Sequence, residues 1–338
     1  MGSIFAERLF LDPAYHEPEL IVQQSQASGY METLAGRGLR TRIGNIDKAI
    51  YINTLAVRSQ VAANQATHNQ LPSATVVGGY IQIPTYTFRT RAEYNQFDIM
   101  EAAQYNVALP EAQRLAMRQG TFQAIRNAGL YGVNAQNSEG LVNAPGATTT
   151  NLPADSFGNT TLQTWDNGQL AIWFNGLINA ALTRMFLGGT PVRLCILGPQ
   201  RVLLQMETEN IVQVVSYQRP GAGSATTAQV ITKVNEEFGY IIDWAFDDTL
   251  IGQGANGDDL VILAVPEINV QKMPQINTND FATISPNMAG NILQYSDMIA
   301  PMEVTTPIPE GVDVVSTIRV SPGWVVRSQA ITLASIPY

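Results

Sequence analysis

The sequence is poor in cysteine, histidine and charged residues. Cys195 is the only cysteine, which excludes an internal disulfide bond and a zinc site built from several thiolates. The two histidines, His16 and His68, lie in segments without a regular hydrophobic pattern, and no Gly-x-Ser-x-Gly sequence is present. A catalytic triad of the hydrolase type is therefore not expected. A single cysteine also fits a reducing compartment.

Charged residues make up only 14% of the chain, well below the fraction of about a quarter that is usual for a soluble domain. The 19 basic and 28 acidic residues give a formal net charge of −9. The three lysines, Lys48, Lys233 and Lys272, are far apart, so a clustered phosphate-binding surface is not expected. Few lysines and glutamates are typical of a surface with extensive protein contacts, and net acidity weakens adhesion to nearby DNA.

Residues 1–42 contain several prolines and glycines and no sustained hydrophobic period, which predicts an extended arm with short helical pieces. They lack the long apolar core of a signal peptide. The most apolar long segment, Leu170 to Leu187, is interrupted by Asn175, Asn179 and Arg184. No transmembrane helix is predicted, and we expect no membrane partner.

The segment from Ala49 to Arg91 reads as a long two-stranded excursion. Strand-like runs lie at Ala49 to Ile52, at Tyr80 to Ile83 and at Tyr86 to Arg91, with alternating faces. Ala62 to Ser73, between the first two runs, is rich in Asn, Gln and Ala and predicts a polar tip. Because an isolated hairpin is marginally stable in water, we expect its strands to rest on a neighbouring molecule.

Two helices follow. Pro110 and Glu111 are typical of a first helical turn, and the pattern predicts a long helix as far as Gly129. Asn134 to Phe157 reads as a loop, and Leu170 to Leu182 follows the i, i+3, i+4 rule of a second helix. The apolar stripe expected on the first helix consists of Ala112, Leu115, Phe122 and Ile125.

From Pro191 the pattern becomes α/β. Small residues fill Arg219 to Thr227, which predicts a loop at a solvent-facing tip or a symmetry axis. Near the end, alternating runs at Val312 to Val320 and Trp324 to Leu333 flank Ser321-Pro322-Gly323 and predict a hairpin. The expected α/β elements are strands at Val192–Leu197, Ile211–Tyr217, Tyr240–Phe246 and Leu260–Val265, and helices at Gly198–Met206 and Thr227–Phe238.

Three chemical signals each have an ordinary structural interpretation. Gly252 to Gly257 matches G-x-G-x-x-G, but a strand follows it and acids flank it, so a loop between strands is favoured over a nucleotide site. Asp243, Asp247, Asp248, Asp258 and Asp259 match no calcium-binding loop and favour a solvated acidic rim over a metal site. Cys195 lies within an apolar strand, where a buried inert thiol is expected. We therefore predict no catalytic residue, cofactor or metal.

Three segments, at Tyr86 to Tyr94, at Gly129 to Pro145 and at Leu194 to Pro266, together resemble the Hong Kong 97-type major capsid protein of tailed bacteriophages. Tyr86 to Tyr94, before the helix at Pro110, is similar to the strand that leaves the family's extended loop. Gly129-Leu130-Tyr131-Gly132, followed by Gly140-Leu141-Val142-Asn143-Ala144-Pro145, is similar to the turn after the family's spine helix. The region from Leu194-Cys195-Ile196-Leu197-Gly198-Pro199 to Val265-Pro266 resembles its axial domain.

The resemblance implies an α+β fold of the Hong Kong 97 type and a non-enzymatic shell subunit. The expected divisions are an N-terminal arm (1–42), an extended loop hairpin (43–95), a peripheral domain with the spine helix (96–179), an axial α/β domain (180–273) and peripheral return strands (274–338). The implied partners are copies of the chain in hexamers and pentamers, scaffold, portal and decoration proteins, and packaged double-stranded DNA without sequence-specific contacts. The implied location is the virion, after assembly in the bacterial cytoplasm.

Two other functions remain open from the sequence. An encapsulin-type nanocompartment shares the fold but packages a protein cargo, so a co-purifying enzyme would distinguish it. An α/β nucleotide-binding enzyme would use the glycine loop at Gly252 to Gly257, and nucleotide binding by the isolated chain would distinguish it.

Overall fold

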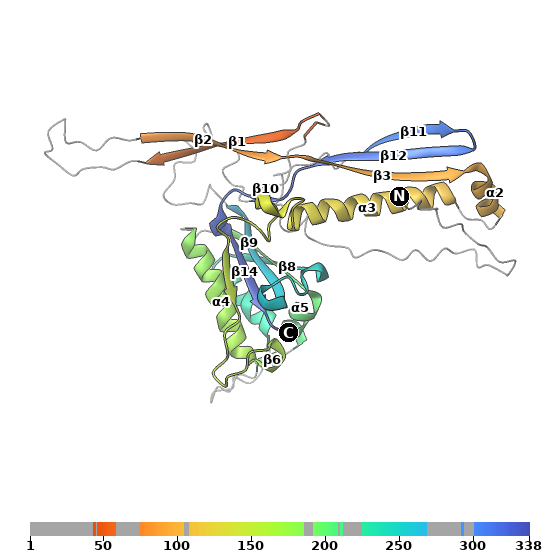
Figure 1. The fold of residues 1–338 in the computed structure, drawn as a ribbon. Coiled ribbons are helices and arrows are strands. Elements are labelled where there is room, and N and C mark those ends of the chain that lie inside the picture. Colours follow the sequence, from red (N-terminus) through yellow and green to blue (C-terminus); the bar gives the residue numbers. More distant parts are fainter. Residues whose placement is uncertain are drawn as a thin grey trace.

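The computed structural model describes residues 43–44, 46–58, 75–104, 108–185, 192–208, 210–211, 225–268, 292–293 and 301–338. The expected arm at 1–42, the polar tip at 62–73 and both histidines lie outside the described residues, as does most of the loop at 219–227. The chain forms a long upper layer and a separate lower body (Figure 1).

A two-stranded hairpin projects from one end of the upper layer (Figure 1). It consists of β1 (Ala49–Arg58) and β2 (Thr75–Pro84), which pair antiparallel from Ala49 opposite Pro84 to Arg58 opposite Thr75. The predicted pairing of the first two runs is confirmed, whereas the third run, Tyr86 to Arg91, lies in a different sheet and was wrongly included in the excursion. We call β1 and β2 the hairpin.

The rest of the upper layer is a three-stranded sheet with one long helix against it. We call this unit the spine. Tyr94, Met117 and Val314 form its core. The long helix predicted from Pro110 to Gly129 is confirmed and has 22 residues. The spine consists of β3 (Tyr86–Asn95), α2 (Gln96–Gln104), α3 (Leu109–Leu130), β11 (Met302–Ile308) and β12 (Gly311–Val320), with strand order β11-β12-β3.

The face of α3 that is buried differs from the predicted stripe. Leu115 and Phe122 are 42% and 38% exposed, and Ala112 is also exposed, so only Ile125 of the four predicted positions is buried. Met117 packs against Tyr94 and Val314 of the sheet, and Thr121 is also buried. Because the sheet covers one side of the helix, a second apolar side is left in solvent.

A five-stranded mixed sheet forms the centre of the lower body, which we call the lobe. Its strand order is β4-β14-β9-β5-β8, in which β5 and β8 run parallel and β9 runs antiparallel to β5 and β14. The expected strands at 192–197, 240–246 and 260–265 are confirmed. The lobe strands are β4 (Thr148–Asn151), β5 (Val192–Gly198), β8 (Ile241–Phe246), β9 (Asp259–Ile268) and β14 (Ile331–Ile336).

Both faces of the lobe sheet are covered. On one face, Phe174, Ile178, Met206 and Ile231 from three helices pack against Ile196 and its neighbours. These helices match those predicted from 170, 198 and 227. They are α4 (Asn167–Arg184), α5 (Gln200–Thr208) and α6 (Thr227–Glu237). The described residues also form the short strands β6 (Asn210–Ile211), β7 (Ala225–Thr226), β10 (Ile292–Leu293) and β13 (Trp324–Val325).

The other face of the lobe sheet packs against the spine. Leu130 at the end of α3, Leu141 in the following loop and Val320 at the end of β12 join the cluster that contains Leu197 and Ile262. Central strands buried on both faces read as continuous apolar runs, which explains why β5 and β9 were recognisable in the sequence. One cluster of buried residues thus spans the contact between the spine and the lobe.

The predicted C-terminal hairpin is wrong. β12 pairs with β11 and β3, whereas β14 pairs with β4 and β9 in the lobe. The backbone of the expected turn is bonded elsewhere, because Gly323 N donates to Ala128 O and Gly140 N donates to Gly323 O. The chain therefore leaves the spine after Val320 and enters the lobe.

Two observations bear on the expected divisions of the chain. The division at residues 179 and 180 falls inside α4, and β14, from the segment expected to return to the peripheral part, belongs to the lobe sheet.

No helix of the described residues has the length and hydropathy needed to span a membrane.

Candidate functional site

The glycine-rich sequence at Gly252 to Gly257 forms a loop between β8 and β9. Gly254 N donates to Asp258 O at 2.7 Å, and Gly252 N donates to the Asp259 carboxylate at 3.2 Å. A dinucleotide fingerprint needs a helix after the glycines, so that the helix N-terminus can hold the pyrophosphate. The strand β9 follows instead, which confirms the interpretation as a loop between strands.

Hydrogen bonds and ion pairs hold the five nearby aspartates at separate places. Asp243 pairs with Arg193 across β5 and β8, and Asp248 accepts a hydrogen bond from Gln200 N at 2.8 Å. Asp247 accepts from Thr249, and Asp258 accepts from Ser335 Oγ. In the described part of the chain, no cluster of three or more acidic, histidine or cysteine side chains could hold a metal ion.

Asp259 is the most buried of these carboxylates, at 1% exposure. Arg201 donates two hydrogen bonds of 2.6 Å to its two oxygens, and the Arg201 guanidinium lies 4.7 Å from the centre of the Tyr338 ring. A bidentate pair of this kind is strong and directional. The pair fixes α5 against β9, which is a structural role.

Cys195 lies in the middle of the lobe sheet and is fully buried. Burial raises the pKa of its thiol far above the usual value, because a thiolate would lose its hydration there. A protonated, inaccessible thiol is a poor nucleophile. The expectation of a buried thiol is confirmed.

One buried carboxylate, Glu139, ties the loop after α3 to the spine sheet. Glu139 is 1% exposed and accepts hydrogen bonds from Tyr86 Oη at 2.7 Å, Asn134 N at 3.0 Å, Asn137 Nδ2 at 3.1 Å and Val133 N at 3.3 Å. Burial acts to raise the pKa of Glu139, but these hydrogen bonds outweigh it and lower the pKa below its ordinary value. Tyr86 belongs to β3, so Glu139 ties the spine sheet to the loop.

Glycines let the backbones in this loop cross closely. Gly132 and Gly140 have φ values of +77° and +87°, which glycine adopts without strain. A Cβ atom on Gly132 would lie 2.6 Å from Glu139 O, and one on Gly140 would overlap the backbone of Tyr131 and Gly132. Gly323 approaches the Gly129 carbonyl in the same way. We call this crossing, with Glu139, the junction.

The sequence predicted a turn here by resemblance but did not identify Glu139 as its centre. The available signal was an isolated acid in a stretch of Asn, Gly and Ala, directly before Gly140. A carboxylate is the side chain that can accept several hydrogen bonds at once, so such an acid fits a loop with many free N–H groups.

The hairpin exposes apolar side chains. Tyr51 and Tyr80 are 60% and 69% exposed, and their rings meet edge to face with centres 5.8 Å apart. Val77, which the antiparallel register places on the other face, is also 60% exposed. Strands with apolar residues exposed on both faces are typical of a segment that another molecule covers.

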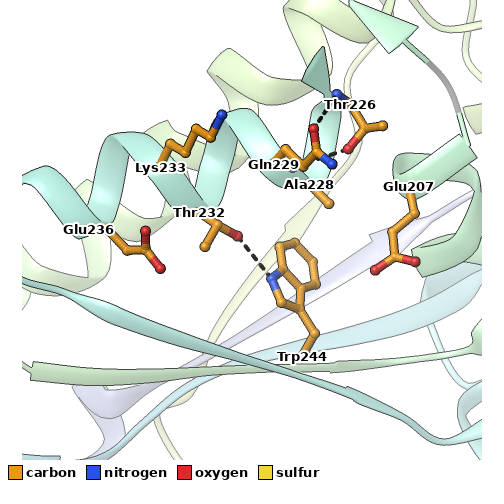
Figure 2. Close-up of a pocket in the computed structure, with 8 residues that line it drawn as sticks. All are labelled: Glu207, Thr226, Ala228, Gln229, Thr232, Lys233, Glu236 and Trp244. Atoms are coloured by element: carbon orange, nitrogen blue, oxygen red, sulfur yellow. Dashed lines mark hydrogen bonds between the residues drawn. The ribbon is translucent and has the colours of Figure 1, made fainter. Parts of the chain in front are cut away.

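Apolar side chains are also exposed on the spine and the lobe. Besides Leu115 and Phe122 of α3, Phe97 of α2 is 69% exposed. On the lobe, α5, α6 and β8 line an open groove with Trp244 at its base, and Trp244 Nε1 donates to Thr232 Oγ1 at 3.2 Å (Figure 2). Glu207, Lys233 and Glu236 also line the groove (Figure 2). Other exposed apolar residues of the lobe are Val234 of α6, Phe238 directly after it, and Ile241 and Phe246 of β8.

No protein-family model and no curated protein sequence matches the chain. Solved structures do match it over nearly its whole length. The capsid of Myoviridae phage XM1 matches with a TM-score of 0.69 at 11% identity, over 96% of each chain. The capsid of cyanophage P-SCSP1u has a TM-score of 0.57 at 12% identity, over 97% of this chain and 93% of that one. The capsid of an empty GTA particle has a TM-score of 0.54 at 12% identity, over 97% and 96%.

These matches extend over the hairpin, the spine and the lobe together. Their low sequence identities explain why only the three-dimensional comparison finds them. The chain therefore has the Hong Kong 97-type fold of tailed-phage capsid proteins.

Proposed function

We propose that this chain is the major capsid protein of a tailed phage, a non-enzymatic subunit that assembles into an icosahedral shell around double-stranded DNA. The main support is the hairpin, which carries exposed apolar side chains on both faces and projects away from the chain's own core. The matching structures are capsids, so we interpret the exposed hairpin as a contact between subunits of a shell.

In this proposal the roles follow the parts seen in the structure, in which β4, α4 and β14 belong to the lobe. The arm and the hairpin contact neighbouring subunits, the spine forms the peripheral part, and the lobe forms the axial part of hexamers and pentamers. We infer that scaffold, portal and decoration proteins are further partners, and that assembly takes place in the host cytoplasm. A net charge of −9 supports packaging of DNA without sequence-specific contacts, because an acidic shell does not hold the duplex.

Negative-stain microscopy of the purified full-length chain tests the proposal. We expect closed particles of uniform size that elute far ahead of a 36.7 kDa monomer on size exclusion. A monomer that stays soluble at high concentration and in the presence of polyethylene glycol would contradict the proposal.

The same preparation distinguishes the two other functions. Particles that contain a co-purifying enzyme instead of nucleic acid, when isolated from the natural host, would indicate an encapsulin-type compartment. A monomer that binds ATP or NAD in a calorimetric titration would indicate the nucleotide-binding enzyme. Removal of the glycines at Gly252 and Gly254 would then abolish that binding.

A further inference from the structure

β11 is an edge strand of the spine. In the described part of the chain it pairs with β12 on one side and with no strand on the other. Met302 and Val304 are each 49% exposed, and Glu303, Thr305, Thr306 and Pro307 are exposed as well. A seven-residue edge with apolar side chains is a ready template for pairing with another strand.

The register of β11 shows which backbone groups point outward. Pro307 lies opposite Val312, and because proline has no N–H, this pair cannot be one that exchanges hydrogen bonds. Hydrogen-bonded and non-hydrogen-bonded pairs alternate in an antiparallel ladder. Glu303 and Thr305 share the parity of Pro307, so their N–H and C=O groups point away from β12.

Prolines bracket this outward-facing edge at both ends. Pro301 directly precedes β11 and has the same parity as Glu303, Thr305 and Pro307. The edge therefore offers two N–H donors, with a position that lacks a donor on each side. This arrangement is symmetric about Val304.

We propose that β11 pairs antiparallel with β11 of a second copy of this chain, across a two-fold axis at Val304. In this register Glu303 lies opposite Thr305 of the second copy, and Thr305 lies opposite its Glu303. Each of these pairs exchanges two hydrogen bonds, so both outward donors of each copy are used. Pro301 lies opposite Pro307 of the second copy, where neither residue has a donor to leave unpaired.

The side chains are compatible with this register. Val304 meets Val304 of the second copy on the face of the sheet away from α3, and Met302 meets Thr306 there. Glu303 does not lie directly opposite another Glu303, which avoids the least favourable charge pair. The pairing joins two spines into a six-stranded sheet, and the prolines keep the contact short and closed.

The inference rests on the proposed function, since a shell supplies many copies of the chain at close range. Self-complementarity favours a second copy over a different strand, because only an identical edge carries the same symmetric spacing of prolines. Residues 1–42 of this chain, as an alternative occupant of the edge, would leave Val304 far from its counterpart, so the following test separates them.

Disulfide trapping in assembled particles tests the register. The non-hydrogen-bonded pair at Val304 would bring two Cα atoms within about 4.5 Å, which a disulfide spans. We expect Val304→Cys particles, after mild oxidation, to migrate mostly as dimers in denaturing gels without reductant. Background is low, because Cys195 is the only native cysteine and is buried.

Met302→Cys and Thr306→Cys serve as matched controls on the same face of β11. Each residue lies four positions from its own counterpart in this register, about 13 Å away, so each variant alone is expected to stay monomeric. Particles assembled from a mixture of the two variants are expected to give the dimer, because residue 302 of one copy faces residue 306 of the other.

Monomeric Val304→Cys in intact particles would overturn the inference, as would equal dimerisation of all three single variants. If the native chain forms no particles, the proposed function is wrong. Oxidation of concentrated soluble Val304→Cys subunits then still tests the edge, with dimers supporting the pairing and monomers contradicting it.

Discussion

The lobe and the hairpin differ in where their apolar side chains find contacts. In the lobe, both faces of the sheet are covered, and residues such as Phe174 and Ile196 are almost fully buried within the same chain. In the hairpin, Tyr51, Tyr80 and Val77 are more than half exposed. Buried apolar area stabilises a fold, whereas exposed apolar area becomes useful only when another molecule covers it. The apolar residues of the lobe thus stabilise the fold of one chain, whereas those of the hairpin are available for contact with another molecule.

The largest effect on stability is expected in the lobe. Phe174→Ala should lower the free energy of unfolding of the unassembled subunit by about 4 kcal/mol, because it removes a buried ring and leaves a cavity. Denaturant unfolding of subunits measures this effect. Ile172→Ala, two residues away on α4 and 73% exposed, is the control and should cost less than about 0.5 kcal/mol. An equal loss of unfolding free energy in the two variants would contradict the assignment of Phe174 to the core.

The junction should show the next largest effect. Glu139→Ala leaves two backbone N–H groups and the Tyr86 hydroxyl without their acceptor, which should cost about 3 kcal/mol. Glu139→Gln keeps one carbonyl acceptor and should cost less. Unfolding of both variants, beside the native subunit, measures the difference. An unchanged unfolding midpoint for Glu139→Ala would show that the contact between the spine sheet and the loop after α3 does not depend on this carboxylate.

The same carboxylate predicts part of the acid sensitivity of the subunit. Hydrogen bonds lower the pKa of Glu139 in the folded state, so its contribution is fully present above its unfolded-state pKa. That contribution is lost as the pH falls below about 4.5, the ordinary value, and through the lower folded-state pKa. Between pH 7 and pH 3, the free energy of unfolding should decrease less steeply for Glu139→Gln than for the native chain. Parallel curves would contradict this assignment.

The smallest effect on subunit stability, and a large effect on assembly, is expected in the hairpin. Tyr51→Ser combined with Tyr80→Ser should change the unfolding free energy by less than about 0.5 kcal/mol, because both rings are already exposed. Assembly yield should fall at least about tenfold, as expected when aromatic contacts of an interface are lost. Particle yield is measured by sedimentation. Gln82→Ser, an exposed polar change on the same strand, should leave both quantities unchanged.

The sequence predicted the parts of the fold in which one chain decides the burial pattern. Leu194 to Leu197 and Leu260 to Val265 are continuous apolar runs, because both faces of these strands are buried within the lobe. The hairpin strands were visible from their alternation and the polar stretch between them. The expectation that the hairpin rests on a neighbouring molecule stays a prediction, supported by the exposure of Tyr51, Val77 and Tyr80.

The failures have a common physical origin. Leu115 and Phe122 form an apolar side of α3 that the chain itself does not cover, so an apolar stripe alone did not identify the buried face. Alternation in Trp324 to Leu333 showed strand character but not the partner strand, which lies far away in the sequence. The role of Glu139 depends on Tyr86, 53 residues earlier, and no local pattern reports such a contact.

The position of β14 also has a consequence for the order in which the protein is made. Ile331 to Ile336 emerge from the ribosome after every other strand of the lobe sheet, yet they lie between β4 and β9. Until then β9 has one open edge, and β4 has no neighbour in the sheet. The lobe therefore cannot close during synthesis of its earlier strands. Synthesis of β14 therefore sets the earliest time at which a subunit becomes competent to join others.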